Sequence, residues 1–337
     1  MRLRKIAKRA ATTLLVVIGL LIAVVCVFDQ QRRSRETEIA AAVAPRSGRF
    51  VQSGDVKIFV QESGPANAPA VMLIHGTGTW SEIWRETIDA LSADHHVIAV
   101  DLPPFGYSDK PLGEPAYTRQ VQASRLIQLI EMLHLRNVTL VGHSVGARPV
   151  VEAALRSPAL ISRLVLIDPA LGFQTNRNAA SHYEQNHPSW PARTLFGIPS
   201  LRNAVISAYG TNPLFTARLF RSFVSNKAAV TPQRVEIIQR PMQVRETTAA
   251  YGAWLRFLVI AEDQSLSSNF ANLRRLSLPV GIIWGRTDTV TPLWQGERLR
   301  ELIPHARLIV MDGVGHIPYI EDPSHFIAAL RKLLSSS

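Results

Sequence analysis

The stretch Gly142-His143-Ser144-Val145-Gly146 directly follows an apolar run, residues 138–141. A serine between two glycines at this spacing is typical of a sharp turn from a strand into a helix, where only small residues fit two positions to either side. Such a turn strains the backbone of the central residue and exposes its side chain above the carboxyl end of the strand. Ser144 is therefore the candidate nucleophile, unless the turn is purely structural.

An earlier apolar strand opens into a second loop that contains glycine. Residues 70–74 are apolar, and His75-Gly76-Thr77-Gly78 follows them. Next to a nucleophilic serine, such a loop supplies one of the backbone N–H groups that hold the negative oxygen of a tetrahedral intermediate. We predict that the N–H groups of Thr77 and Val145 form this oxyanion hole. An ordinary turn from strand to helix is the simpler alternative.

Two predicted strands near the C-terminus are followed by the residue types that would complete a catalytic triad. Asp288 comes just after the apolar run 280–284, and His316 lies in the glycine-rich loop that follows residues 308–311. A serine is activated when a base accepts its proton and an acid orients that base. We predict that His316 is this base and that Asp288 is the orienting carboxylate.

Other residues compete for both roles. Among the ten histidines, His75 and His143 lie inside the glycine motifs, where we expect them to shape the loops and not to transfer protons. Asp168 ends an earlier strand and could reach the same imidazole, and Asp312 shares a loop with it. Asp101, in the turn after another strand, is interpreted as a structural carboxylate.

At these positions the sequence resembles the α/β-hydrolase superfamily, in particular the capped group with epoxide hydrolases, C–C bond hydrolases, haloperoxidases and monoacylglycerol lipases. The resemblance covers about residues 50–334, includes the stretches 101–110 and 315–323, and extends to the chain order serine, aspartate, histidine. It implies an α/β-hydrolase fold with a mostly parallel eight-stranded sheet, but it is poorly specific for substrate. Epoxide hydrolases and haloalkane dehalogenases carry aspartate where this chain has Ser144, so their alkyl-enzyme ester to aspartate is excluded.

Composition and periodicity divide the chain into parts. With 337 residues, 47% of them hydrophobic, the chain can build a large core. Apolar strands that alternate with helical stretches such as 121–133 favour a parallel sheet covered on both faces. Between two late strands, helical spacing over 195–209 and 235–258 predicts an inserted cap. We expect the hydrolase core over residues 50–170 and 276–337, and a helical cap over 171–275.

The N-terminus predicts a membrane anchor. An uncharged, mostly aliphatic run of 19 residues, 10–28, follows five cations. A helix needs ~20 such residues to cross the hydrocarbon core, whereas a cleaved signal peptide has an apolar region of ~7–15 residues and a small-residue cleavage site just after it. Charged residues follow the run and separate it from Ala42-Val43-Ala44. We expect an anchor over 1–28 and a juxtamembrane linker over 29–49, with a cleaved signal as the alternative.

The cations on either side of this run indicate its orientation. Five precede it, and Arg32, Arg33 and Arg35 follow it closely. The positive-inside rule therefore favours a cytoplasmic N-terminus, with the catalytic domain in a periplasmic or extracytoplasmic space. The one cysteine, Cys26, lies inside the run, so no intramolecular disulfide can form.

The net charge of +11 is unevenly distributed, because residues 1–49 carry +7, residues 171–275 carry +7 and the remainder carries −3. A basic surface suits nucleic acid or anionic lipid. The sequence has no nucleic-acid motif and already has a predicted membrane anchor. We therefore expect anionic lipid at the cap and no nucleic acid, with a solvated basic face as the alternative.

Together these patterns predict a membrane-anchored serine hydrolase of the esterase or lipase type. It would cleave a carboxylic ester with an apolar acyl group through an acyl-enzyme on Ser144, without a cofactor or a metal. A C–C bond hydrolase of a diketone could use the same residues. A non-catalytic binding protein with this fold is the third alternative, and the complete set of Ser144, Asp288 and His316 argues against it.

Overall fold

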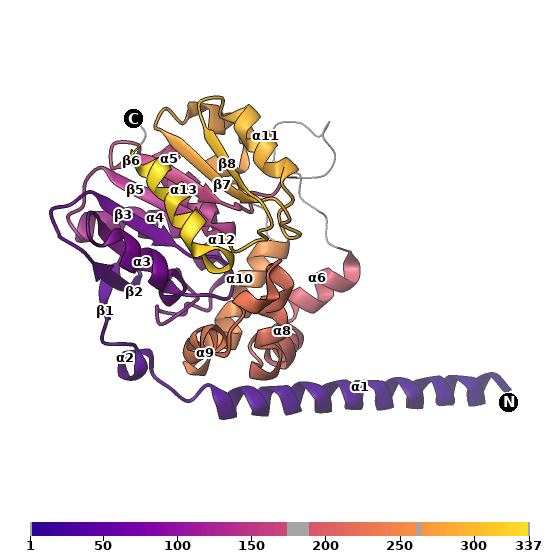
Figure 1. Ribbon diagram of the computed structural model, residues 1–337. Helices are drawn as coiled ribbons and strands as arrows, with labels where there is room; N and C mark the ends of the chain where they lie inside the picture. Colours follow the sequence, from indigo (N-terminus) through magenta and orange to yellow (C-terminus); the bar gives the residue numbers. More distant parts are fainter. Residues whose placement is uncertain (1, 174–188, 261–263, 336–337) are drawn as a thin grey trace.

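The computed structural model describes residues 2–173, 189–260 and 264–335 (Figure 1). Its centre is an eight-stranded sheet in the order β1-β2-β4-β3-β5-β6-β7-β8. The β1–β2 and β2–β4 pairs are antiparallel, and the other pairs are parallel. This confirms the mostly parallel eight-stranded sheet. The strands are β1 Gly48–Ser53, β2 Val56–Ser63, β3 Ala70–Ile74, β4 His96–Val100, β5 Val138–His143, β6 Ile161–Ile167, β7 Val280–Gly285 and β8 Arg307–Met311.

The sheet is apolar on both faces, which explains why its inner strands are continuous hydrophobic runs. Side chains alternate along a strand: in β3, Met72 and Ile74 pack in one buried cluster, and Val71 and Leu73 pack in the other. Helices cover both faces. They are α3 Arg85–Leu91, α4 Arg119–Met132, α5 Ala147–Arg156, α11 Trp294–Leu302, α12 Pro318–Glu321 and α13 Pro323–Ser335.

The described residues between β6 and β7 form a group of helices on one side of the sheet's carboxyl edge (Figure 1). The two long helical stretches expected here are broken. Pro199 begins a new helix after the extended Ile198, because the residue before a proline avoids helical geometry. Residues 174–188 and 261–263 of the expected cap lie outside the described part. The cap elements include α6 Trp190–Gly197, α7 Pro199–Val205, η4 Ile206–Gly210, α8 Pro213–Phe223, α9 Pro232–Gln239, η6 Arg240–Gln243 and α10 Thr247–Ile260.

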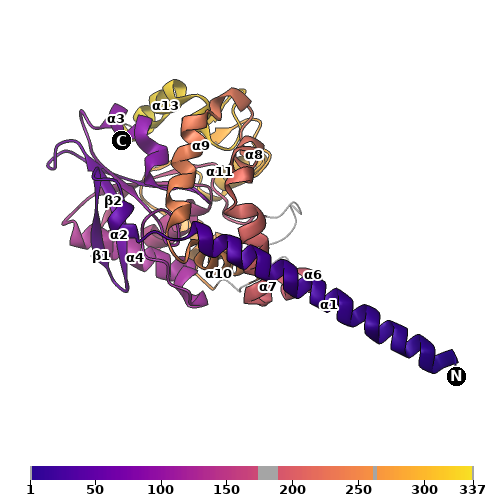
Figure 2. The same cartoon turned by 90° about the horizontal axis from the view of Figure 1, so that it is seen from below.

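The N-terminal helix α1, Arg2–Arg35, projects from the body, and its C-terminal end lies against the cap (Figures 1 and 2). Residues 29–49 differ from the expected linker. They contain the last turns of α1, the short helix α2 Ala40–Val43 and the start of β1. The charged residues after the apolar run therefore belong to a helix with folded contacts.

Candidate active site

Ser144 lies at the turn from β5 into α5, in a conformation that the two flanking glycines permit. Its φ is +52°, in the left-handed region that a residue with a side chain rarely adopts. A Cβ on Gly142 would come within 2.8 Å of the Ala147 Cα, and a Cβ on Gly146 would come within 2.2 Å of the His75 carbonyl oxygen. The close approach of these backbones explains the small residues of the motif.

Because β5, β7 and β8 run parallel, the loops after their carboxyl ends meet at one edge of the sheet. The Ser144 Oγ lies 2.9 Å from the His316 Nε2, and the His316 Nδ1 lies 2.7 Å from the Asp288 Oδ2. All three residues are buried. The structure thus brings together, in hydrogen-bonding order, the three residues that the sequence singled out.

Asp288 is held as a carboxylate. Its Oδ1 accepts the backbone N–H groups of Val290 and Thr291, at 2.7 and 3.0 Å, and its Oδ2 accepts the Thr291 hydroxyl at 2.6 Å. Burial acts to raise the pKa of Asp288, but His316 and these hydrogen bonds outweigh it and leave the pKa below its usual value. Thr291 was not among the predicted site residues, although its spacing of three residues from Asp288 is a local signal for such a turn.

Asp168 is the competing carboxyl group, and it is fully buried with a φ of +40°. Its Oδ1 accepts the Gly285 N–H at 2.8 Å. Burial and the nearby Asp288 charge raise the pKa of Asp168 well above its usual value. Burial and charge thus favour the neutral form of Asp168, whereas the contacts of Asp288 favour its charged form. The other competitor, Asp312, is exposed and pairs with Arg286.

Glu321 fixes the loop that carries His316, a role that the sequence analysis did not detect. Its Oε1 accepts the N–H groups of Gly315 and Ile317 at 3.0 and 3.3 Å, and its Oε2 accepts those of Ser225 and Asn226 at 2.7 and 3.0 Å. The same carboxyl group therefore joins the histidine loop to the cap segment after α8.

The loop after β3 passes directly beside the nucleophile. A Cβ on Gly76 would lie 3.1 Å from the Ser144 Cβ. Thr77 is the residue after Gly76, and Val145 is the residue after Ser144. The placement is compatible with both oxyanion donors, whose role stays a prediction.

His75 and His143 are bonded as neutral rings. The His75 Nδ1 lies 2.7 Å from the Gly76 carbonyl oxygen, which can only accept, so the Nε2 accepts the Leu102 N–H at 3.0 Å. The His143 Nε2 donates to the His316 carbonyl oxygen at 2.8 Å, and its Nδ1 lies 3.0 Å from the Tyr319 hydroxyl. Burial lowers the pKa of His75 to about 4 and that of His143 to about 3.

This burial predicts acid sensitivity. An imidazole that is neutral when folded takes up a proton on unfolding below pH ~6.5, so its contribution to the free energy of unfolding is complete at higher pH and falls as the pH falls. With a folded pKa of about 4, His75 should lower the free energy of unfolding by about 2 kcal/mol between pH 8 and pH 5. In urea unfolding, we expect the free energy of unfolding of the unchanged protein to fall by this amount more than that of His75→Gln. Exposed His325→Gln is the control, and parallel pH profiles for all three proteins would contradict the prediction.

The cap contacts the site from two directions. At the end of α8, the Phe223 carbonyl oxygen accepts the His316 N–H at 2.9 Å. On the other side, Tyr251 and Trp254 of α10 make edge-to-face contacts with Phe105 of the core at ring distances of 5.3 and 5.0 Å. Val145 packs against this aromatic cluster. The cap therefore roofs the residues on either side of the Ser144 hydroxyl.

A small hollow, partly open to solvent, lies between the core and the cap. It begins at Gly78 and Thr79, next in the chain to the predicted oxyanion donor Thr77. The described residues that line it include no charged side chain. The lining residues are Gly78, Thr79, Pro104, Phe105, Gly106, Thr211, Ile238, Pro241, Met242, Thr247 and Tyr251. Among the residues that the structure describes, no group of three or more His, Cys, Asp or Glu could hold a metal ion.

Fold and site geometry define an α/β hydrolase, and the comparisons agree. Residues 69–323 match the model of the alpha/beta hydrolase fold family, to which the chain belongs. It is 26% identical to the 2-hydroxymuconate semialdehyde hydrolase of a Pseudomonas species (87% of this chain, 96% of that protein) and 27% identical to monoacylglycerol lipase abhd6-A of Xenopus laevis (86% and 82%). Bromoperoxidase from Bacillus anthracis is similar in structure, with a TM-score of 0.69, 21% identity and coverage of 86% and 100%. The resemblance drawn from the sequence is thus confirmed.

Proposed function

We propose that this chain is a serine hydrolase that cleaves carboxylic esters with an apolar acyl group. The observation that carries the proposal is the hydrogen-bonded chain from Ser144 through His316 to Asp288. An α/β hydrolase with these residues in this order has the nucleophile, the base and the orienting acid that acyl transfer needs. The hydrolase class follows from the family, and the ester specificity is our inference.

In the proposed reaction, the His316 Nε2 accepts the Ser144 proton while the Ser144 Oγ attacks the ester carbonyl carbon. The carbonyl oxygen becomes negative and is held by the N–H groups of Thr77 and Val145. When the intermediate collapses, the alcohol leaves with the proton from His316. Water then enters, gives a proton to His316 and cleaves the acyl-enzyme, which releases the carboxylic acid and restores the Ser144 hydroxyl. Asp288 keeps the imidazole in the required tautomer and stabilises its charged form.

The lining of the hollow favours a neutral ester. The name of the relative monoacylglycerol lipase abhd6-A specifies an ester substrate, whereas other relatives include 2-hydroxy-6-oxo-2,4-heptadienoate hydrolase, whose substrate carries a carboxylate. A buried carboxylate requires a partner of opposite charge or several hydrogen bonds. The described lining offers hydroxyl groups and apolar side chains, but no cation. A substrate with apolar chains and a neutral ester group therefore fits it better.

The proposal is tested with the full-length protein, a fluorophosphonate probe and a panel of substrates. We expect covalent labelling, and a kcat/KM at least ten times higher for neutral esters than for a 2-hydroxy-6-oxo-dienoate. A preference for the dienoate would assign the chain to C–C bond hydrolysis. Failure both to label and to turn over any member of the panel would assign it to binding without catalysis.

We also propose that α1 anchors the enzyme in a membrane. It is the one helix in the described part of the chain that is long and apolar enough to cross a bilayer, and large apolar side chains from Leu15 to Val27 are exposed along it. The catalytic domain would then lie on the extracytoplasmic side, as the positive-inside rule favours. The excess positive charge of the cap would face anionic lipid.

A further inference from the structure

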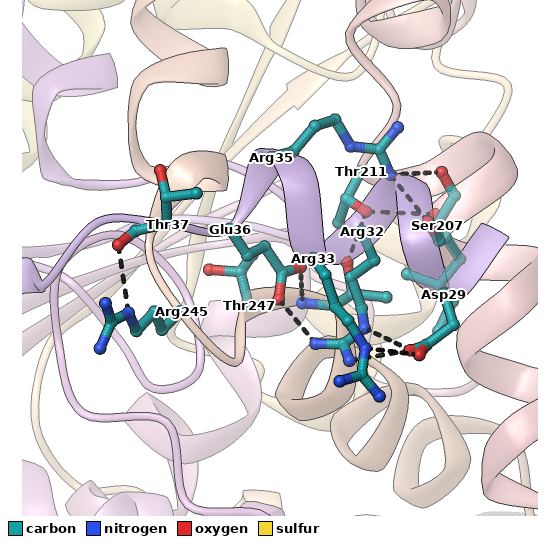
Figure 3. A network of polar contacts seen from close by, with 12 residues as sticks. Asp29, Arg32, Arg33, Arg35, Glu36, Thr37, Ser207, Thr211, Arg245 and Thr247 are labelled. Atoms are coloured by element: carbon teal, nitrogen blue, oxygen red, sulfur yellow. Dashed lines mark hydrogen bonds and ion pairs between the residues drawn. The ribbon is translucent and has the colours of Figure 1, made fainter. Parts of the chain in front are cut away.

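The C-terminal end of α1 is docked tightly on the cap. The Ser207 Oγ of η4 donates to the Phe28 carbonyl oxygen at 2.8 Å, and the Arg35 guanidinium donates to the carbonyl and hydroxyl oxygens of the same Ser207, both at 2.8 Å (Figure 3). These contacts link two successive turns of α1 to the cap element that follows α7. The helix and the cap are therefore in direct contact at this point.

The residues just after α1 extend this docking along the cap. Glu36 is buried, and its carboxylate accepts the Thr248 N–H at 2.7 Å and pairs with Arg32 at 3.3 Å. The chain then pairs with the segment before α10, where the Glu38 N–H donates to the Gln243 carbonyl oxygen at 3.0 Å and the Arg245 N–H donates to the Glu38 carbonyl oxygen at 2.9 Å. A flexible tether would make no such set of contacts, so the orientation of the cap relative to α1 is fixed.

The docking also sets the level of the cap relative to a bilayer. The uncharged run of α1 ends at Phe28, so η4, which bonds to that residue, lies at the edge of the apolar zone. The elements that contact α1 are α7 and η4. In both views α6 is displaced along the direction of α1 toward the N-terminus (Figures 1 and 2). If α1 spans the bilayer, α6 therefore lies on the membrane side of η4.

This part of the cap exposes large apolar side chains that a water-facing surface does not need. Trp190 at the start of α6 is 79% exposed, and Leu214 in α8 is 85% exposed. Ile198, Val205 and Tyr209 lie between them in the chain and are also exposed. Tryptophan and tyrosine are enriched at the interface between membrane and water. Exposed arginines in the same helices, among them Arg193 and Arg218, suit anionic headgroups.

We propose that these five residues form a bilayer-contacting surface, and that the docked end of α1 holds this surface in the leaflet nearest the catalytic domain. The inference rests on the proposed membrane anchoring and goes beyond it, since the cap would enter the interface in a fixed orientation. Lipid is selected as the occupant because η4 docks on α1 at Phe28, where the exposed apolar run of the proposed membrane span ends. The docking contacts also adjoin the hollow between the core and the cap. Thr248 bonds to Thr211 at 2.8 Å, and Thr211 lines that hollow.

Fluorescent labels test this placement in full-length protein reconstituted in phosphatidylcholine–phosphatidylglycerol vesicles with brominated acyl chains. The chain has one cysteine, Cys26, in the apolar run, so Trp190→Cys and Leu214→Cys can each be labelled in a Cys26→Ser background. Met132→Cys is the matched control, because Met132 is also exposed and ends α4, which lies far from α6 in both views. We expect brominated chains to reduce the fluorescence at residues 190 and 214 at least twofold and to leave that at residue 132 unchanged.

The native Cys26 label separates this inference from the anchoring itself. Quenching at residue 26 without quenching at 190 and 214 would overturn the bilayer-contacting surface and retain the anchor. No quenching at residue 26 would overturn the anchor, and the surface with it. Labels at 190 and 214 that neither lipid bromine nor aqueous iodide can quench would place a second protein copy on this face.

A kinetic comparison provides an independent readout. We expect Trp190→Ser with Leu214→Ser to lower kcat/KM three- to tenfold on an ester embedded in the bilayer, and to leave the value for a soluble short-chain ester unchanged. The control pair Leu112→Ser with Met132→Ser removes two apolar side chains that are also exposed but lie outside the cap. Equal effects of the two pairs on the embedded ester would overturn the proposal.

Discussion

Ser144→Ala should abolish both ester turnover and fluorophosphonate labelling of the full-length protein. Removing the Oγ removes the atom that would form the acyl-enzyme, and the turn between Gly142 and Gly146 holds no other hydroxyl at that point. His316→Ala should be nearly as damaging, because the members of a triad act as a unit. We expect kcat to fall by about 10⁶-fold in either variant, the scale of losing a whole triad.

The control for this prediction is Ser222→Ala, which removes an exposed hydroxyl of α8 that bonds to the Leu219 carbonyl oxygen. Its labelling and turnover should equal those of the unchanged protein. The measurements are the initial rate on a short-chain ester and the mass of the labelled protein. Labelling that persists in Ser144→Ala would place the nucleophile elsewhere and remove the basis of the proposed mechanism.

The positions of the candidate site residues could be predicted because each stands at the end of an apolar run. Parallel strands bring all their carboxyl ends to one edge of a sheet, so Ser144, Asp288 and His316 meet although the chain separates the serine and the histidine by 172 residues. The strand pattern and the glycine spacing are local signals, and the chain order then assigns the roles. No further long-range information was needed for these three residues.

The contacts between cap and site could not be predicted in this way. Glu321 reaches Ser225 across 96 residues, and Glu36 reaches Thr248 across 212 residues. A charged residue near the end of a helix has the same local pattern whether it is solvated or buried against a distant backbone. The contacts of the predicted linker over 29–49 are of the same kind, because Arg35 and Glu36 bond to Ser207 and Thr248, in a part of the chain with no matching motif.

The choice of acid yields the second large effect. Asp288→Asn should lower kcat by about 10⁴-fold, the scale seen when the carboxylate of a triad is made neutral. The amide can still accept from the backbone N–H groups of Val290 and Thr291, but it no longer carries the charge that stabilises the His316 imidazolium. The expected loss of kcat therefore comes from weaker stabilisation of the charged imidazole and from loss of its required tautomer. The fold is unaffected, so the circular dichroism and the unfolding midpoint should change little.

Asp168→Asn is the matched variant, and we expect it to cost less than tenfold in kcat. Burial and the Asp288 charge raise the pKa of the Asp168 carboxyl group well above its usual value. This favours the neutral form, which asparagine replaces with a neutral group of similar shape. Its side-chain oxygen can still accept the Gly285 N–H, the hydrogen bond that Asp168 makes now. The His316 Nδ1 bonds to Asp288 at 2.7 Å, and this contact is unaffected by the change. The opposite ranking of the two variants would move the orienting acid from the end of β7 to the end of β6, and equal large losses would show that the two carboxyl groups share the proton and act as a pair.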